Sequence, residues 1–149
     1  MNLKTIAAAT FLCLGAAAAT GVAVAQEPQA ARQQMMKDVG RSMGALAGIA
    51  KGEKPYDAEV VRVSLATISE VSKTFPDQFP AGTETGAETE ASPKIWENPD
   101  DFHAKSAQLG KDADAALAAL PGDQAAVAAA IGPIGKNCGA CHETYRIKK

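Results

Sequence analysis

The sequence has few histidines and cysteines, no excess of basic over acidic residues, and no segment with the pattern of a β-strand. It contains two histidines and three cysteines, so a zinc site with four ligands would need both histidines and has no second cysteine pair to use. Its formal charge is −2, which gives no basic excess for nucleic acid or an anionic membrane surface. No segment alternates apolar and polar residues as a strand does. The composition therefore disfavours a zinc protein, a nucleic-acid-binding protein and a β-sheet protein.

The first 25 residues differ in kind from the rest. Lys4 places one positive charge ahead of an apolar stretch over residues 6–19, and the small-residue site Ala23-Val24-Ala25 follows. This order is typical of a secretory signal peptide, and the apolar stretch is shorter than the roughly 20 residues of a membrane-spanning helix. We therefore predict that residues 1–25 are a signal peptide. We also predict that the mature protein lies in the periplasm and does not insert into the membrane.

Residues 26–149 make up the expected mature chain. Its 124 residues are enough for one domain with one core. Cleavage removes Lys4, so 14 basic residues face 17 acidic ones and the formal charge becomes −3. Cys13 lies within the apolar stretch and leaves with it, so the mature chain keeps two cysteines, Cys138 and Cys141.

Proline and glycine divide the mature chain into four segments of helical length. Apolar residues recur at helical spacing in each of them, over residues 30–51, 57–75, 100–120 and 123–146. Asp57 precedes the second helix as an N-cap, and Pro133 lies inside the fourth, where it predicts a kink or a break. Residues 83–92 are rich in Thr, Glu and Gly and predict a mobile surface loop. We predict an all-α antiparallel four-helix bundle.

The stretch Cys138-Gly139-Ala140-Cys141-His142 carries the chemistry of the chain. Two thiols three residues apart on a helical turn can add to the two vinyl groups of haem, while the adjacent imidazole binds the iron. A thioredoxin-like redox pair would need a strand before its helix, and none is predicted. We therefore predict one covalent haem c on Cys138 and Cys141, with His142 as the proximal iron ligand. Apolar residues at intervals of three or four turn this face toward the bundle interior.

The group on the other side of the iron decides the function, because an open iron binds gases whereas a ligated iron mainly carries electrons. His103 is the only other histidine, and its place beside Phe102 is typical of a surface or packing residue. Met35, Met36 and Met43 lie in the first helix, where a thioether would complete a His/Met iron. Methionine is also a common core filler. Met36 and Met43 share one helical face, and periodicity does not choose between them.

A haem motif at the end of a four-helix chain resembles the class II cytochromes c, the cytochrome c prime family. The resemblance covers the mature chain and is closest to the low-spin cytochrome c-556 group. Several of the stretches that carry it are shared with cytochromes c prime. They are Met36-Lys37-Asp38, Gly40-Arg41, residues 50–57, residues 92–96, Pro133-Ile134-Gly135-Lys136 and residues 138–143.

The resemblance implies a periplasmic electron carrier, not an enzyme, in which Met36 is the distal iron ligand. In cytochromes c prime the same position holds an apolar residue that covers a five-coordinate, high-spin iron, and such proteins bind or sequester NO and CO. Arg32 and Arg146 match basic residues of the distal and proximal pockets, although each also fits a solvated surface charge. Trp96 matches a position that packs near the haem, and Met43 remains a further pocket candidate.

The resemblance says less about partners. Homodimers are common in the family, usually through the first two helices, so a homodimer remains open for this chain. An electron carrier also needs redox protein partners, which the sequence does not identify. The mildly acidic mature chain would suit a partner with a basic docking patch.

Overall fold

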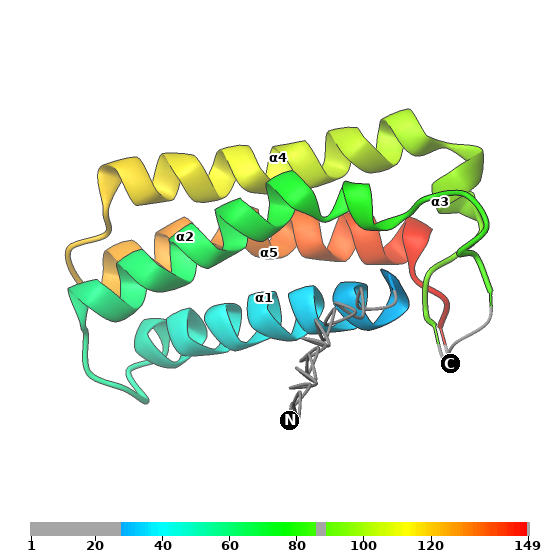
Figure 1. Cartoon of the computed structure of the whole chain (residues 1–149). Coiled ribbons are helices and arrows are strands. Elements are labelled where there is room, and N and C mark those ends of the chain that lie inside the picture. Colours follow the sequence, from blue (N-terminus) through cyan, green and yellow to red (C-terminus); the bar gives the residue numbers. More distant parts are fainter. Residues whose placement is uncertain (1–27, 86–88, 149) are drawn as a thin grey trace, which may run out of the picture.

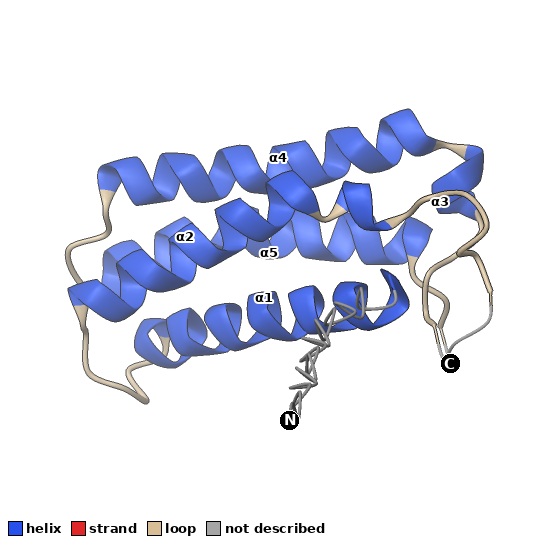
Figure 2. Cartoon of the chain, in the orientation of Figure 1, coloured by secondary structure: helices blue, strands red, loops and turns tan. Residues whose placement is uncertain are grey.

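The computed structural model describes residues 28–85 and 89–148. Four long helices run side by side in alternating directions (Figures 1 and 2): α1 Pro28–Ala50, α2 Ala58–Thr74, α4 Pro99–Ala119 and α5 Gln124–Tyr145. The connection from α2 to α4 carries the 3-10 helix η1 (Pro76–Gln78) and the short helix α3 (Lys94–Glu97). The predicted all-α antiparallel bundle is confirmed. The predicted signal peptide, residues 1–25, lies outside the described residues.

Two of the long helices begin at aspartates that cap them. The Asp57 carboxylate accepts hydrogen bonds from the backbone N–H groups of Glu59 at 2.9 Å and Val60 at 3.1 Å. Asp123 accepts one from the N–H of Ala126 at 2.8 Å. These bonds satisfy donors that the first turn of a helix leaves without partners. The caps therefore explain why α2 and α5 begin within one residue of their predicted starts.

Across residues 28–85 and 89–148, no helix has both the length and the apolar character to cross a membrane.

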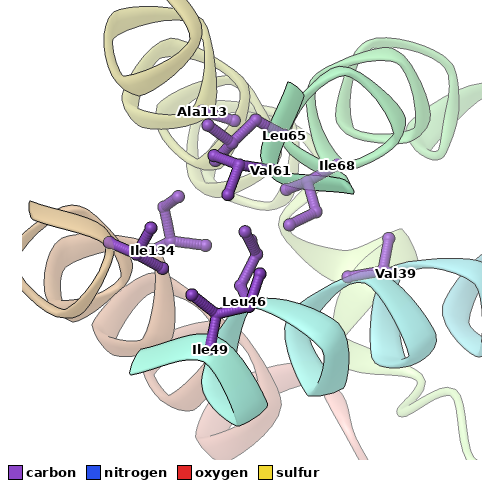
Figure 3. Packing of buried hydrophobic residues seen from close by; sticks show 9 residues of the cluster. Val39, Leu46, Ile49, Val61, Leu65, Ile68, Ala113 and Ile134 are labelled. Carbon is purple, nitrogen blue, oxygen red and sulfur yellow. The ribbon is translucent and has the colours of Figure 1, made fainter. Parts of the chain in front are cut away.

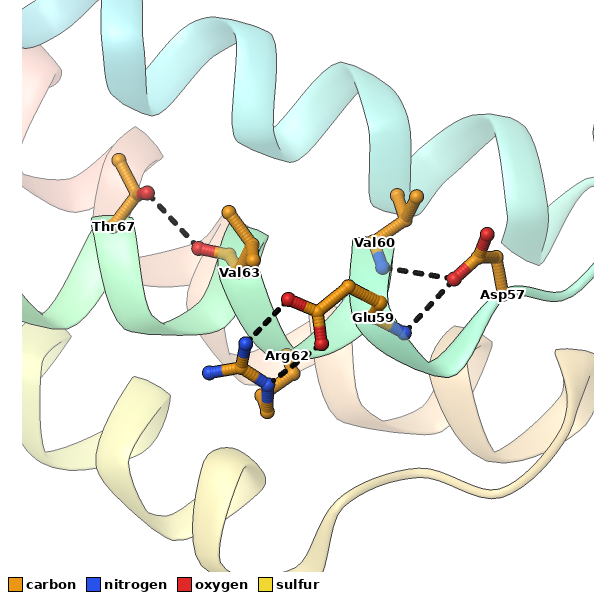
Figure 4. A network of polar contacts seen from close by, with 6 residues as sticks. All are labelled: Asp57, Glu59, Val60, Arg62, Val63 and Thr67. Carbon is orange, nitrogen blue, oxygen red and sulfur yellow. Dashed lines mark hydrogen bonds and ion pairs between the residues drawn. The ribbon is translucent and has the colours of Figure 1, made fainter.

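Replacing Asp57 by alanine should lower the free energy of unfolding by about 1 kcal/mol, since two backbone donors of α2 lose their acceptor (Figure 4). Asp57→Asn is the matched control, because asparagine caps helices about as well as aspartate. Chemical denaturation of the three proteins measures the difference. Equal losses in both variants would contradict a capping role.

One apolar core runs between the four long helices (Figure 3). Its buried side chains come from the inner face of each: Val39, Leu46 and Ile49 of α1, Val61, Leu65 and Ile68 of α2, Ala113 of α4, and Val127 and Ile134 of α5. Met36 and Met43 are partly buried and pack against the same core. Helical spacing predicted these inner faces correctly because each helix buries one stripe of its surface.

A second cluster closes the end of the bundle at which α3 lies. Phe102 is buried at its centre, with its ring centroid 4.9 Å from that of Phe79 and 5.2 Å from that of Tyr145. The Trp96 ring lies 5.7 Å from Phe79, and Cys141 packs against the same group. We call this group the aromatic cluster. The start of α1 and the end of α5 lie at this end of the bundle (Figure 1).

Pro133 does not break the last helix. α5 is continuous from Gln124 to Tyr145, so of the kink or break predicted at Pro133 the break is wrong. Pro133 and its neighbours Gly132 and Gly135 are exposed. The carbonyl that loses its hydrogen bond belongs to the exposed residue Ala129, so it is open to hydrogen bonding by solvent.

Candidate functional site

The last turns of α5 carry the predicted haem motif. Cys138 and Cys141 lie about one turn apart, and both are partly buried free thiols. Burial raises the pKa of each thiol, so both are protonated at neutral pH. Because Cys141 packs against the aromatic cluster, this face of α5 turns toward the interior, as its apolar spacing predicted.

Two polar contacts from α4 hold α5 on either side of the motif. Directly before it, Nδ2 of Asn137 donates to Oδ2 of Asp112 at 2.6 Å. Just after it, the Tyr145 hydroxyl donates to Oδ2 of Asp101, also at 2.6 Å. Both carboxylates belong to α4, so the motif is fixed against that helix at both of its ends.

Replacing Tyr145 by phenylalanine should change how stability depends on alkaline pH. Burial, followed by the Asp101 carboxylate, raises the pKa of Tyr145 from 10.0 to about 12. Between these values the folded protein holds the phenolic proton and the unfolded chain has lost it, so the free energy of unfolding falls as pH rises. Tyr145→Phe should flatten this fall, and denaturation at a series of pH values measures it.

Tyr56→Phe is the control for that experiment, because it removes a hydroxyl bonded to the Pro121 carbonyl, away from the motif. The fall between pH 10 and 12 should be flatter in Tyr145→Phe than in Tyr56→Phe. If Tyr145→Phe kept the wild-type fall, the proposed titration of Tyr145 would be wrong.

His142 lies on the open side of the motif. With Glu90, Gly139, Glu143 and Arg146 it lines a shallow depression of about 670 Å³. Partial burial lowers the pKa of the imidazole, as does the neighbouring Arg146 charge, while Glu90 opposes the shift. The ring is therefore neutral at physiological pH, which is the form that binds a metal.

Hydrogen bonds join the two segments that border this depression, residues 90–92 and residues 145–147. The N–H of Ser92 donates to the Tyr145 carbonyl at 2.9 Å, and the N–H of Ile147 donates to the Glu90 carbonyl at 2.8 Å. The side chains of Arg146 and Glu90 form an ion pair, with Nε 2.6 Å from Oε2. The Arg146 side chain is 53% exposed, so it is a surface charge that also has an acidic partner. Residues 89–92 also differ from the predicted mobile loop, because the end of the chain holds them.

The donor set fits a covalently attached haem. Two reduced thiols sit one turn apart on a face that meets apolar and aromatic side chains, and a neutral imidazole follows at the next position. Cys138 and Cys141 would hold the porphyrin edge, and His142 would supply the iron ligand. Over the described part of the chain, no three His, Cys, Asp or Glu side chains gather as a metal-binding group.

The contact between Gln124 and Ala50 shows how α5 lies along α1. Nε2 of Gln124 donates to the Ala50 carbonyl at 3.3 Å, and the two helices run in opposite directions (Figure 1). Each helix rises about 1.5 Å per residue. Residues that are equally far from this contact along their own helices therefore lie at about the same height in the bundle.

This register separates the two candidate methionines. Met36 is 14 residues before the contact residue of α1, and Cys138 is 14 residues after that of α5. Met43 is 7 residues before, level with Ile131. Met36 thus lies level with the haem motif, whereas Met43 lies about 10 Å away along the axis at the rise of an α-helix. Met35 is about 100 degrees around α1 from Met36.

The remaining predicted pocket residues fall in different places. Arg32 is 5% exposed, so its interpretation as a solvated surface charge is wrong. Trp96 belongs to the aromatic cluster, and its indole N–H donates to the Pro80 carbonyl at 3.3 Å. His103 is exposed and lines a different depression, with Lys73 on α2.

Sequence reasoning missed the polar residues that hold the site. These are Glu90, Asp101 and Asp112, whose partners lie 25 to 56 positions away in the chain. Helical periodicity marks only the buried apolar face of each helix, so it carries no signal for polar contacts made outside that face.

A four-helix bundle whose last helix carries Cys-x-x-Cys-His, with both cysteines partly buried, defines a c-type haem protein of the bundle class. The family model described as Cytochrome C' matches residues 27–146. The chain belongs to this family. It is a haem electron-transfer protein with one covalently attached haem c.

Individual relatives include both types of cytochrome named above. A cytochrome c-556 of Agrobacterium fabrum is 56% identical over 152 residues, which span 100% of this chain and 99% of the relative. The solved structure of cytochrome c' from Rhodopseudomonas palustris has a TM-score of 0.79 at 38% identity, with 84% of this chain and 99% of that chain covered. An NMR-validated structural model of oxidized cytochrome c556 from R. palustris has a TM-score of 0.75 at 38% identity and the same coverage.

Proposed function

We propose that the protein is a low-spin electron carrier in which His142 and Met36 are the axial iron ligands. Cys138 and Cys141 hold the haem through thioether bonds. The observation that carries this proposal is the register of the helices, which brings Met36 level with Cys138 while its side chain packs against the interior. The 56% identity to a cytochrome c-556 over the whole chain supports it further.

Each proposed ligand is carried by a long helix that is packed into the bundle. Bound haem c supplies an iron that exchanges one electron between its ferric and ferrous states. His142 is held by α5, which α4 anchors on both sides of the motif. Met36 is held by α1, whose inner face packs into the core. Retaining the same two ligands in both states keeps reorganisation small, and a thioether ligand favours the ferrous state.

The apolar side chains around the proposed ligands also affect the reduction potential. Ile134 on α5 and Val39 on α1 are buried in the core beside the two ligand-bearing segments. Exclusion of water from this space disfavours the extra positive charge of the ferric state, so burial raises the reduction potential. The proposal assigns no acid, base or nucleophile to the site, and we propose a carrier rather than an enzyme.

Cell location and assembly belong to the same proposal. We propose export to the periplasm through the signal peptide of residues 1–25, and exchange of electrons there with other redox proteins. Intact mass of the exported protein locates the cleavage site, expected after Ala25. Sedimentation of the purified holoprotein distinguishes a monomer from the homodimer that is common in the family.

Absorption spectra of the purified ferrous protein, with and without carbon monoxide, test the coordination. A six-coordinate iron with a methionine ligand should give a low-spin spectrum that carbon monoxide changes slowly or not at all. A high-spin spectrum with rapid binding of carbon monoxide would contradict the proposal and favour the five-coordinate, gas-binding alternative.

A further inference from the structure

Arg32 fastens the start of α1 to the chain that follows α2. Its Nε donates to the Gln78 carbonyl at 2.7 Å and its Nη1 to the Thr83 carbonyl at 3.1 Å, while Nη2 bonds the Thr83 hydroxyl. The guanidinium carbon lies 4.2 Å from the Phe79 ring centroid and 5.4 Å from that of Trp96. All three guanidinium nitrogens therefore have protein partners, and the guanidinium makes cation–π contacts with the Phe79 and Trp96 rings.

Gln29 strengthens the same attachment. Its Nε2 donates to the carbonyl oxygens of Thr83 at 3.3 Å and Thr85 at 3.2 Å. The loop is braced in turn, because the Thr83 hydroxyl donates to the Pro80 carbonyl at 2.7 Å. We call the contacts of Arg32 and Gln29 with residues 78–85 the Arg32 clamp. Residues 83–85 are thus held to α1, unlike the mobile loop that the sequence predicted.

The first two turns of α1 depend on this clamp. The buried residues of α1 ahead of Val39 are Gln29 and Arg32, and both are polar. Helix ends held by few buried apolar contacts open locally at low free-energy cost. Met36 follows Arg32 by one turn, so opening of this segment would reach the proposed iron ligand.

We propose that Arg32 is a positioning residue that keeps Met36 on the iron and so closes the iron to outside ligands. This inference rests on the proposed function, because it needs Met36 to be the ligand. With the clamp closed, α1 stays helical and in register through Met36. When it opens, Met36 would no longer be held at the iron of bound haem, and a small neutral ligand such as carbon monoxide would bind there with no change in oxidation state.

The rate at which carbon monoxide binds the ferrous holoprotein measures clamp opening, because binding follows the population in which Met36 is detached. Arg32→Lys keeps the positive charge but loses the planar fork that reaches two carbonyls at once. We expect this rate to rise by about tenfold or more, in proportion to the open population. Thr83→Ala removes the side-chain partner and should cause a smaller rise, and it serves as a second variant if the first folds poorly.

Two controls separate positioning from general loss of stability. Arg41→Gln removes an arginine of the same helix whose side chain is 71% exposed. Asp57→Ala removes the cap at the start of α2, and that start lies at the end of the bundle opposite α3 (Figure 1). Neither should change the rate of carbon monoxide binding, measured well below the unfolding temperature.

The outcomes are distinct. A faster rate in Arg32→Lys and Thr83→Ala with both controls unchanged supports the clamp. Wild-type rates in the Arg32 and Thr83 variants, in a low-spin protein, would overturn the clamp and leave the proposed function standing. Equal increases in the variants and both controls would also overturn it. A wild-type protein that is already high-spin would overturn the proposed function and the clamp with it.

Discussion

Met36→Ala is expected to convert the iron from six-coordinate and low-spin to five-coordinate and high-spin. Met36 lies level with the haem motif, and alanine leaves no side chain that could reach the iron in its place. The reduced spectrum should become high-spin, and carbon monoxide should bind fully and rapidly. The reduction potential should fall on the order of 0.1 V, a modest part of the range of about 0.8 V that axial ligands cover.

Met43→Ala is the matched control, because Met43 lies on the same face of α1 and packs against the same core. It should lower the free energy of unfolding by about 2 kcal/mol or more as a core truncation, yet leave the spectrum unchanged. A high-spin spectrum in Met43→Ala with a wild-type spectrum in Met36→Ala would exchange the two assignments. Wild-type spectra in both variants would remove methionine ligation by either residue.

The double variant Cys138→Ala/Cys141→Ala should contain no covalently bound haem. Each thiol accounts for one thioether bond, and the mature chain has no third cysteine to replace them. Extraction of the denatured protein with acidified organic solvent should remove all haem from the double variant and none from the wild type. Loss of the group from the interior should cost at least as much stability as truncating a large aromatic core residue, about 3–5 kcal/mol.

Cys13→Ala controls for loss of a cysteine as such. Cys13 belongs to the predicted signal peptide, so the mature Cys13→Ala product should be identical to the wild type and keep its haem. Each single variant, Cys138→Ala or Cys141→Ala, should keep one thioether bond, which the intact mass measures. Covalent haem in the double variant would contradict the assignment of these two residues.

The predicted helices matched the structure where local physical chemistry decides the outcome. Asp57 caps α2 because a short carboxylate reaches the free N–H groups of its own first turn. Leu46 and Ile134 are buried because their spacing places them on the inner stripe of their helices. Such features depend on residues within one or two turns of each other, so the sequence alone carries them.

The predictions that failed depend on contacts between distant segments. The solvated charge that stood as the alternative for Arg32 is wrong because residues 78–83 fold over its side chain. Of the kink or break expected at Pro133, the break does not occur, and Pro133 lies on the side of α5 that faces solvent. Periodicity likewise left Met36 and Met43 equivalent, because choosing between them needs the register of α1 against α5, which the Gln124 contact reveals.

Polar contacts hold in place the two helices that carry the proposed iron ligands. Asp112 and Asp101 hold α5 on either side of the cysteines, while the Arg32 clamp holds the start of α1. The two proposed iron ligands are thus carried by helices that are each anchored near the aromatic cluster. An electron carrier benefits from this arrangement, since fixed ligands keep the reorganisation on oxidation and reduction small.

The most direct test of the central claim is the proton NMR spectrum of the ferrous holoprotein labelled at its methionine methyl groups. The haem ring current should shift one methyl signal far upfield, and Met36→Leu should remove that signal while Met43→Leu keeps it. Three methyl signals at ordinary positions, or signals broadened by a paramagnetic high-spin ferrous iron, would contradict ligation by Met36.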